Sequence, residues 1–233
     1  MELAHLVPTS LLDYPDRVAA VLFTVGCSFR CPFCHNAELV LPEKARELRL
    51  LDQDEVLTFL AERKGFLDGL VITGGEPTLQ PGLHEFLAEV KRLGFLVKLD
   101  TNGSLPDVLE DLLVRGLVDY VAMDVKAPLA RYSDLAGVSV DLSAIERSTR
   151  LVRGRAPDYE FRTTVAPGLQ GEDLKEIAAL LAGSRRWFLQ PFVVPEGKEL
   201  LDPTCGRRPA LGRSDLLRIW QEVSAGFLGG GVR

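Results

Sequence analysis

Apolar and polar positions along the chain form two patterns that alternate from one end to the other. Short apolar runs with the length and composition of buried strands cover residues 17–25, 69–75, 95–103, 117–128, 159–168 and 186–194. Longer segments with helical spacing of apolar residues follow them, at residues 52–65, 81–94, 105–116, 141–154, 172–183 and 214–226. Each of these segments ends with Gly, as is typical of helix ends, so they are predicted to be amphipathic helices.

Six strand–helix units in strict alternation predict an α/β fold with a parallel sheet and right-handed crossovers. A closed barrel of this kind needs eight units, so six units indicate a partial, splayed TIM-like barrel or an open doubly wound sheet. The sequence has no break that resembles a linker. We therefore expect a single domain over residues 1–233, with residues 1–17 as an N-terminal extension and residues 226–233 as a flexible tail.

Polar and glycine-rich motifs follow the predicted strands. The motif GGEP comes after the second strand, DTNG after the third, MDVK after the fourth and RTTVAPG after the fifth. Because the carboxyl ends of parallel strands meet at one edge of a sheet or barrel, these motifs are expected to converge. The functional site is predicted at that edge.

Composition and charge narrow the possible classes of protein. The chain has 46% hydrophobic and 26% charged residues, which is ordinary for a globular protein. It contains no apolar run of about 18 residues and no pattern of a secretory signal, so we expect a cytoplasmic protein without a membrane span. A net charge of -6 argues against a surface built to bind nucleic acid.

Three of the four cysteines, Cys27, Cys31 and Cys34, lie within eight residues in the spacing C-x3-C-x2-C. Cys205 is distant and is expected to be a small buried apolar residue. A structural zinc site needs a fourth ligand, and the adjacent His35 is poorly placed because neighbouring residues point apart. A 4Fe-4S cluster normally takes four thiolates, so three leave one iron free to coordinate another molecule.

The stretch CSFRCPFC resembles the signature of the radical S-adenosylmethionine enzymes, including the aromatic Phe33 before the third cysteine. The GGEP motif and the array of six strand–helix units extend this resemblance over most of the chain. It implies a partial (β/α)6 barrel in which Cys27, Cys31 and Cys34 hold a 4Fe-4S cluster. S-adenosylmethionine would bind the open iron and be cleaved reductively to a 5'-deoxyadenosyl radical.

The motifs DTNG and MDVK are most similar to the members of this family that activate glycyl-radical enzymes. The resemblance implies a binding site for S-adenosylmethionine made of Phe33, His35, Gly74, Gly75, Glu76, Pro77, Asp100, Thr101, Asn102, Asp124, Val125, Lys126 and Arg162. Lys126 would pair with the carboxylate of the cofactor. Asp100 and Asp124, with Thr101, could hold a monovalent cation beside it. Taken singly, such residues are also typical of turns, caps and surface ion pairs.

Residues 9–36 resemble the activating proteins of anaerobic ribonucleoside-triphosphate reductase. This implies abstraction of a hydrogen atom from a glycine of that reductase. No cysteine lies between Cys34 and Cys205, so an accessory cluster is not expected and an external flavodoxin or ferredoxin would supply the electron. Two alternatives remain open: an enzyme like 7-carboxy-7-deazaguanine synthase acting on a small pterin, and a non-catalytic iron-sulfur or zinc module.

Overall fold

The structure is a computed structural model that describes residues 1–194, 196–197 and 199–233. Within these ranges its strands are β1 (Leu3–Ser10), β2 (Ala19–Thr24), β3 (Gly69–Gly74), β4 (Leu96–Thr101), β5 (Tyr120–Asp124), β6 (Asp158–Val165), β7 (Arg186–Pro191) and β8 (Gly229–Val232). The α-helices are α1 (Ala37–Val40), α2 (Pro42–Ala45), α3 (Gln53–Glu62), α4 (Leu83–Arg92), α5 (Pro106–Val114), α6 (Tyr132–Ala136), α7 (Leu142–Arg155), α8 (Gly171–Leu181) and α9 (Arg213–Val223). Four single 3-10 turns are η1 (Pro77–Leu79), η2 (Leu129–Arg131), η3 (Cys205–Arg207) and η4 (Ser224–Gly226). In the part of the chain described, no helix is long and apolar enough to cross a membrane.

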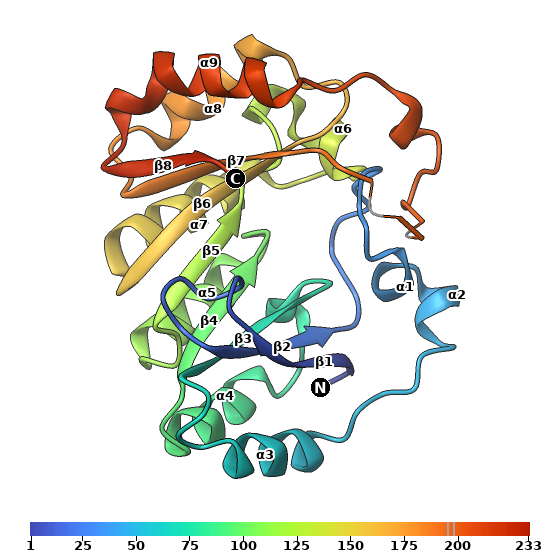
Figure 1. The fold of residues 1–233 in the computed structure, drawn as a ribbon, viewed down its shortest axis with the longest axis vertical. Helices are drawn as coiled ribbons and strands as arrows, with labels where there is room; N and C mark the ends of the chain where they lie inside the picture. The colour runs from blue at the N-terminus through green and yellow to red at the C-terminus, as the bar shows by residue number, and fades with distance from the viewer. Residues whose placement is uncertain (195, 198) are drawn as a thin grey trace.

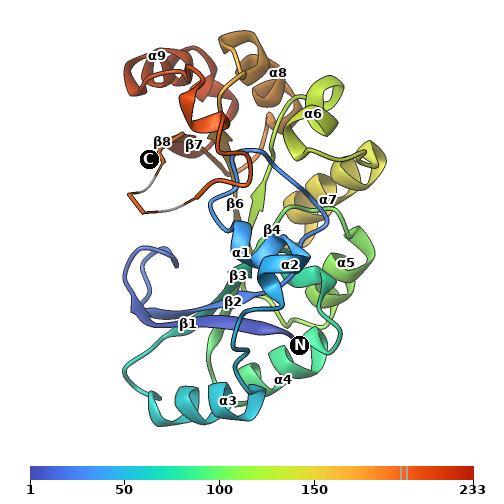
Figure 2. The same ribbon diagram turned by 90° about the vertical axis from the view of Figure 1, so that its right-hand side faces the viewer.

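All described strands belong to one sheet in the order β1-β2-β3-β4-β5-β6-β7-β8. Strands β2 to β8 are mutually parallel, and β1 runs antiparallel to β2. The curved sheet has helices α3 and α4 at one end and α8 and α9 at the other, all on its outer side (Figures 1 and 2). Because β1 and β8 are the two edges of the sheet, the barrel is partial and open, as predicted.

Two edge strands were not predicted from the sequence. Residues 1–17, expected as an N-terminal extension, supply β1, which pairs with β2. Residues 226–233 were expected as a flexible tail, but Gly229–Val232 forms β8 along β7. The N–H of Gly229 donates to the carbonyl of Arg185 at 2.8 Å, and the N–H of Arg233 donates to that of Leu189 at 3.0 Å. A run of glycines has no side-chain pattern that indicates a strand, so this pairing is not visible in the sequence.

The two faces of the sheet carry different side chains because successive residues of a strand point to opposite sides. On the outer face, side chains such as Leu22, Ile72 and Leu99 pack with the helices in the main hydrophobic core. On the inner face, a smaller cluster that includes Val21, Val71 and Tyr120 fills the amino-terminal end of the barrel. Toward the carboxyl ends of the strands, the inner face becomes polar. The barrel therefore has an apolar base beneath a polar, open end.

Candidate active site

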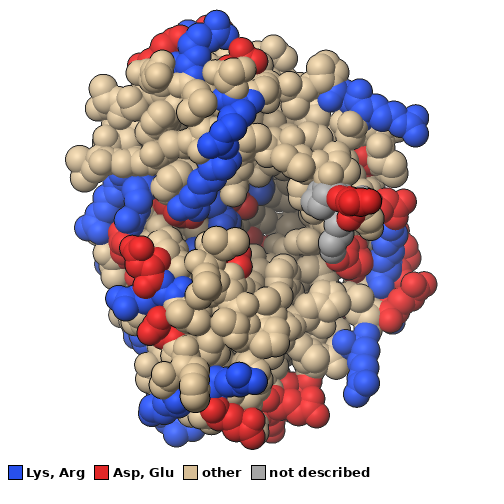
Figure 3. Space-filling view, in the orientation of Figure 1, with Lys and Arg blue, Asp and Glu red and all other residues tan. Residues whose placement is uncertain are grey.

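The polar end of the barrel contains a cavity of about 230 Å³. It is lined by Cys27, Phe29, Cys31, Phe33, Cys34, His35, Asn36, Val40, Thr73, Gly74, Gly75, Glu76, Asp100, Thr101, Asn102, Asp124, Lys126, Arg162 and Thr164. All the predicted site residues line this cavity except Pro77 and Val125, which are buried. The face of the molecule in Figure 3 is hollowed near its centre, and charged side chains of both signs border the hollow. The strand-end motifs thus converge as the sequence predicts.

The loop that carries the three cysteines is held in place by backbone hydrogen bonds from distant parts of the chain. These are Arg30 N–H to Ala136 O at 2.8 Å, Leu201 N–H to Cys34 O at 3.0 Å and Asp202 N–H to Pro32 O at 2.9 Å. The donors and acceptors belong to α6 and to the segment that precedes η3. The loop is therefore fixed on two sides, and its thiols keep their direction toward the cavity.

The three thiols fit a cluster that takes one thiolate per iron, since all three line the same cavity. Burial raises the pKa of the Cys27 thiol to about 11 and that of the Cys31 thiol to about 12. Such thiols lose their protons when they bind metal. Among the described residues, no three side chains of His, Cys, Asp or Glu form a group that could hold a single metal ion. A 4Fe-4S cubane does not need three ligands around one ion, because each thiolate binds a different iron.

The GGEP turn is joined directly to the cysteine loop. The N–H of Glu76 donates to the carbonyl of Gly26 at 2.7 Å, one residue before Cys27. A Cβ at Gly75 would lie 1.8 Å from that same carbonyl oxygen, closer than any side chain permits. Glycine is required at position 75 because the two backbones touch.

The carboxylate of Glu76 is fully buried and links the ends of β3 and β4. It accepts hydrogen bonds from Thr78 N–H (3.2 Å), Thr78 Oγ1 (2.5 Å), Thr101 Oγ1 (2.7 Å) and Asn102 N–H (2.7 Å). Burial raises the pKa of Glu76, and the four hydrogen bonds lower it by a smaller amount. The carboxylate therefore fixes the shape of the cavity wall from behind.

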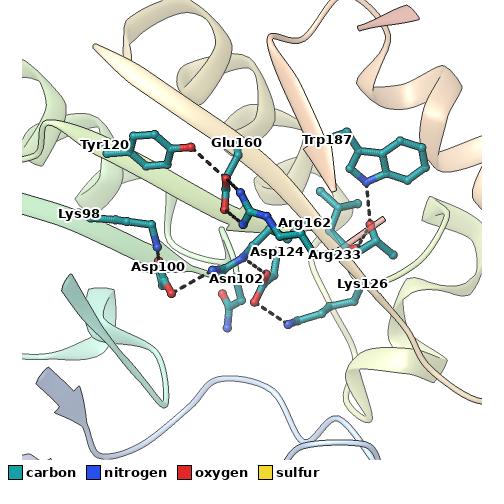
Figure 4. Close-up of polar contacts among 12 residues, drawn as sticks. Lys98, Asp100, Asn102, Tyr120, Asp124, Lys126, Glu160, Arg162, Trp187 and Arg233 are labelled. Carbon is teal, nitrogen blue, oxygen red and sulfur yellow. Dashed lines mark hydrogen bonds and ion pairs between the residues drawn. The ribbon is translucent and has the colours of Figure 1, made fainter. Parts of the chain in front are cut away.

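A chain of alternating charges crosses the inner face of the barrel and forms part of the cavity wall (Figure 4). Lys98 pairs with Asp100, and Arg162 bridges the two carboxylates, with Nη1 3.1 Å from Asp100 and Nε 2.9 Å from Asp124. Lys126 Nζ lies 3.0 Å from the other oxygen of Asp124. Burial alone would raise the pKa of Asp124, but Arg162 and Lys126 outweigh it and hold that pKa well below its usual range.

The residues predicted to hold a monovalent cation contact other side chains in the structure. Its proposed ligands Asp100 and Asp124 are already paired with side-chain cations. The hydroxyl of Thr101 donates to Glu76 and accepts from the N–H of Gly103 at 3.1 Å. The cation stays a prediction, and the sequence did not show that Arg162 lies between the two carboxylates.

Several residues of the site were not identified from the sequence. Lys98 is 2% exposed and ends the chain of charges, while Thr73 and Thr164 line the cavity. Lys98 precedes Asp100 by two positions in a strand, so the alternation of side chains could have placed both on one face. Cys205 is 2% exposed and belongs to the main hydrophobic core, where the sequence analysis expected it.

Comparisons with known proteins agree with this geometry. The family model of the Radical SAM superfamily matches residues 21–181. A protein of Methanocaldococcus jannaschii, named as a candidate glycyl-radical enzyme activating enzyme, is 34% identical over 220 residues, which cover 92% of this chain and 88% of that relative. The pyruvate formate-lyase-activating enzyme of Staphylococcus aureus is 38% identical over 89 residues, which cover 36% of this chain and 34% of that relative.

Solved structures share the fold at low sequence identity. Streptococcus suis SuiB bound to S-adenosylmethionine has a TM-score of 0.70 and 16% identity, covering 91% of this chain and 49% of SuiB. The chain therefore spans about half the length of that structure. The family model matches well over half of the chain, and the Methanocaldococcus relative is similar over nearly its whole length. This chain belongs to the radical S-adenosylmethionine superfamily.

Proposed function

We propose that this chain is an activase of a glycyl-radical enzyme, and that its target is an anaerobic ribonucleoside-triphosphate reductase. One observation supports the enzymatic role above the others: three thiols of one fixed loop open onto the same cavity as the polar ends of four strands, β3 to β6. The names of the relatives support the class of target. The resemblance of residues 9–36 supports the choice of reductase within that class.

Cys27, Cys31 and Cys34 would hold a 4Fe-4S cluster, and S-adenosylmethionine would bind beside it. When bound, these groups supply one-electron chemistry that removes a hydrogen atom from the substrate. The ammonium of Lys126 is at the cavity wall and would bind the carboxylate of S-adenosylmethionine. The turn held by Glu76 would present backbone atoms to the methionine part, since Gly74 and Gly75 carry no side chain there.

The open edge of the sheet suits a protein substrate. The barrel is not closed between β1 and β8, so a peptide loop has more space than in a closed barrel. Four cysteines cannot supply a second cluster beyond the first, so we propose that an external flavodoxin or ferredoxin delivers the electron in the cytoplasm.

The first experiment tests the chemistry. Anaerobically reconstituted protein, reduced with dithionite and given S-adenosylmethionine, is expected to form 5'-deoxyadenosine and methionine. Cys31→Ser should lower the iron content and abolish 5'-deoxyadenosine, whereas Cys205→Ser should keep both. Formation of 5'-deoxyadenosine that does not depend on Cys31, or its absence in protein that carries a cluster, would refute the proposal.

The second experiment tests the target. Mixing the reduced protein and S-adenosylmethionine with the anaerobic reductase of the same organism should give the doublet of a glycyl radical in electron paramagnetic resonance. A reductase whose radical glycine is changed to alanine serves as the control and should give no doublet. A silent spectrum together with turnover of 6-carboxytetrahydropterin would favour a small-molecule substrate instead.

A further inference from the structure

Two N–H groups point toward the sulfur of Cys27. The backbone nitrogen of Phe29 lies 3.4 Å from Cys27 Sγ, and the side-chain nitrogen of Asn102 lies 3.8 Å from it. Sulfur is a larger atom than oxygen, so both distances suit a hydrogen bond. Asn102 follows β4 and is 6% exposed, so its amide is shielded from water. This donor reaches the thiol from another strand end, 75 residues away in the sequence.

The side-chain amide of Asn102 is held in one orientation. Its oxygen accepts a hydrogen bond from the N–H of Ser104 at 2.9 Å, so its nitrogen faces the opposite way. There the nitrogen donates to Ser28 Oγ at 3.0 Å and points at the sulfur of Cys27. A rotated amide would place two N–H donors against each other at Ser104. The backbone N–H of Asn102 also donates to the buried Glu76 at 2.7 Å, so the donor is fixed before a cluster binds.

A hydrogen bond to a cysteine thiolate alters the reduction potential of the cluster that the thiolate binds. Reduction by one electron adds negative charge, which the irons share with the sulfurs around them. An N–H that points at one of these sulfurs therefore stabilises the reduced form more than the oxidised form. The cluster is then reduced at a higher potential, and a weaker electron donor is sufficient.

We propose that Asn102 tunes the cluster: its side-chain N–H donates to the thiolate of Cys27 and raises the potential at which the cluster accepts an electron. In this step the external donor is oxidised by one electron, the cluster is reduced by one electron, and no bond forms or breaks. Asn102 is a positioning residue, because it acts on the cluster through Cys27. The inference rests on the proposed function to the extent that Cys27 holds a cluster.

Redox titration of the reconstituted protein without S-adenosylmethionine provides the first test, because it measures the cluster and not the reaction. Asn102→Leu keeps the size and shape of the side chain and removes the N–H donor. The equilibrium constant for reduction of the cluster should fall by about tenfold, which is about 59 mV for one electron. A change of less than about twofold in a variant that carries the same amount of iron would overturn the proposal.

Two further variants separate the lost donor from a general loosening of the loop. Asn102→Asp keeps the oxygen that accepts from Ser104 N–H and removes the donor, so the equilibrium constant should again fall by about tenfold or more. Ser104→Ala removes a hydroxyl 2.8 Å from Ser28 Oγ but keeps the backbone N–H that orients the amide, so it should change the constant by less than about twofold. If Ser104→Ala lowers the potential as much as Asn102→Leu does, loosening is the cause and the proposal fails.

A spectroscopic measurement does not depend on how the Asn102 variants fold. With ¹⁵N in the side-chain amides of asparagine, pulsed electron paramagnetic resonance of the reduced cluster should show a weak coupling to ¹⁵N. Asn36→Ser should keep this coupling, since Asn102 is its source. Absence of the coupling, or its loss in Asn36→Ser, would overturn the proposal.

The outcomes also distinguish this inference from the proposed function. If 5'-deoxyadenosine never forms but the potential falls in Asn102→Leu, the proposed function fails while the role of Asn102 stands. If 5'-deoxyadenosine forms and the potential is unchanged in Asn102→Leu, the role of Asn102 fails while the proposed function stands.

Discussion

Asp124 makes the stability of the group of ion pairs at the cavity wall depend on pH. Its pKa in the folded protein is lower than the value of about 3.9 in an unfolded chain. A lowered pKa means that ionised Asp124 stabilises the fold at every pH above about 4, and that this contribution is lost as the pH falls through the native value. The stabilisation should therefore be constant over the neutral range.

Asp124→Asn tests this dependence. The change leaves Arg162 and Lys126 without one partner each, so we expect the free energy of unfolding to fall by about 2–3 kcal/mol at pH 7. Urea unfolding of the cluster-free chain should show a constant difference between pH 5 and 8 and a smaller difference below about pH 4. Asp134→Asn, at an exposed position of α6, is the control and should show little difference at any pH. A difference that grows toward acid would contradict the assignment.

At the scale of the elements, contact between β3 and the cysteine loop depends on one glycine. Gly75→Ala would place a Cβ 1.8 Å from the carbonyl oxygen of Gly26, so the turn or the loop must move. We expect this variant to lose about 3 kcal/mol of stability or more, and to bind less iron on reconstitution. Urea unfolding and iron analysis provide the two measurements.

Gly154 offers a matched control in α7. A Cβ at this position meets nothing within 4 Å, and the backbone there is helical. Gly154→Ala should therefore raise stability by about 0.5–1 kcal/mol and leave the iron content unchanged. Equal losses of iron in both variants would show that the close approach at Gly75 has no special role.

The elements that could be predicted from the sequence are those with a regular pattern of side chains. All six strand–helix units have this pattern, and the structure contains each of them. The strand β8 has no such pattern, and packing requires glycine at one of its positions: a Cβ at Gly230 would lie 2.0 Å from the carbonyl oxygen of Trp187 and 2.7 Å from the ring of Trp220. Such a requirement arises from residues distant in sequence, so it cannot be read from the local pattern.

In the candidate site, too, local sequence features could be predicted and contacts between distant residues could not. Cys27, Cys31 and Cys34 are close in sequence, and their spacing was sufficient to indicate a cluster. The partners of Asp100 could not be identified from the sequence. Arg162 comes from a strand 62 residues later and reaches Asp100 only across the folded sheet. Sequence therefore identified the residues of the wall, and the structure was needed to show which of them neutralise one another.

At the scale of the whole molecule, one ion pair joins the edge of the open barrel to its interior. Arg233 follows β8, and its guanidinium contacts both oxygens of Glu160 on β6, at 2.9 and 2.8 Å. Glu160 is 1% exposed and also accepts a hydrogen bond from Tyr120 at 3.0 Å, while the guanidinium lies 3.6 Å from the centre of the Phe188 ring. The pair spans β7 and holds β8 against the sheet.

A double-mutant cycle of Arg233→Met and Glu160→Gln measures this connection. Removing the arginine leaves a buried carboxylate with one partner, so Arg233→Met should lower the free energy of unfolding by about 1–2 kcal/mol. The loss is smaller than for a fully buried pair because the side chain of Arg233 is 41% exposed. The two changes together should cost less than their sum by about 1 kcal/mol, whereas Arg218→Met combined with Glu160→Gln should be additive. Hydrogen exchange at Gly231 and Arg233 should also speed up in Arg233→Met, because β8 is paired on one side only. Additivity of the first pair, with unchanged exchange in β8, would show that the edge strand is held by its backbone alone.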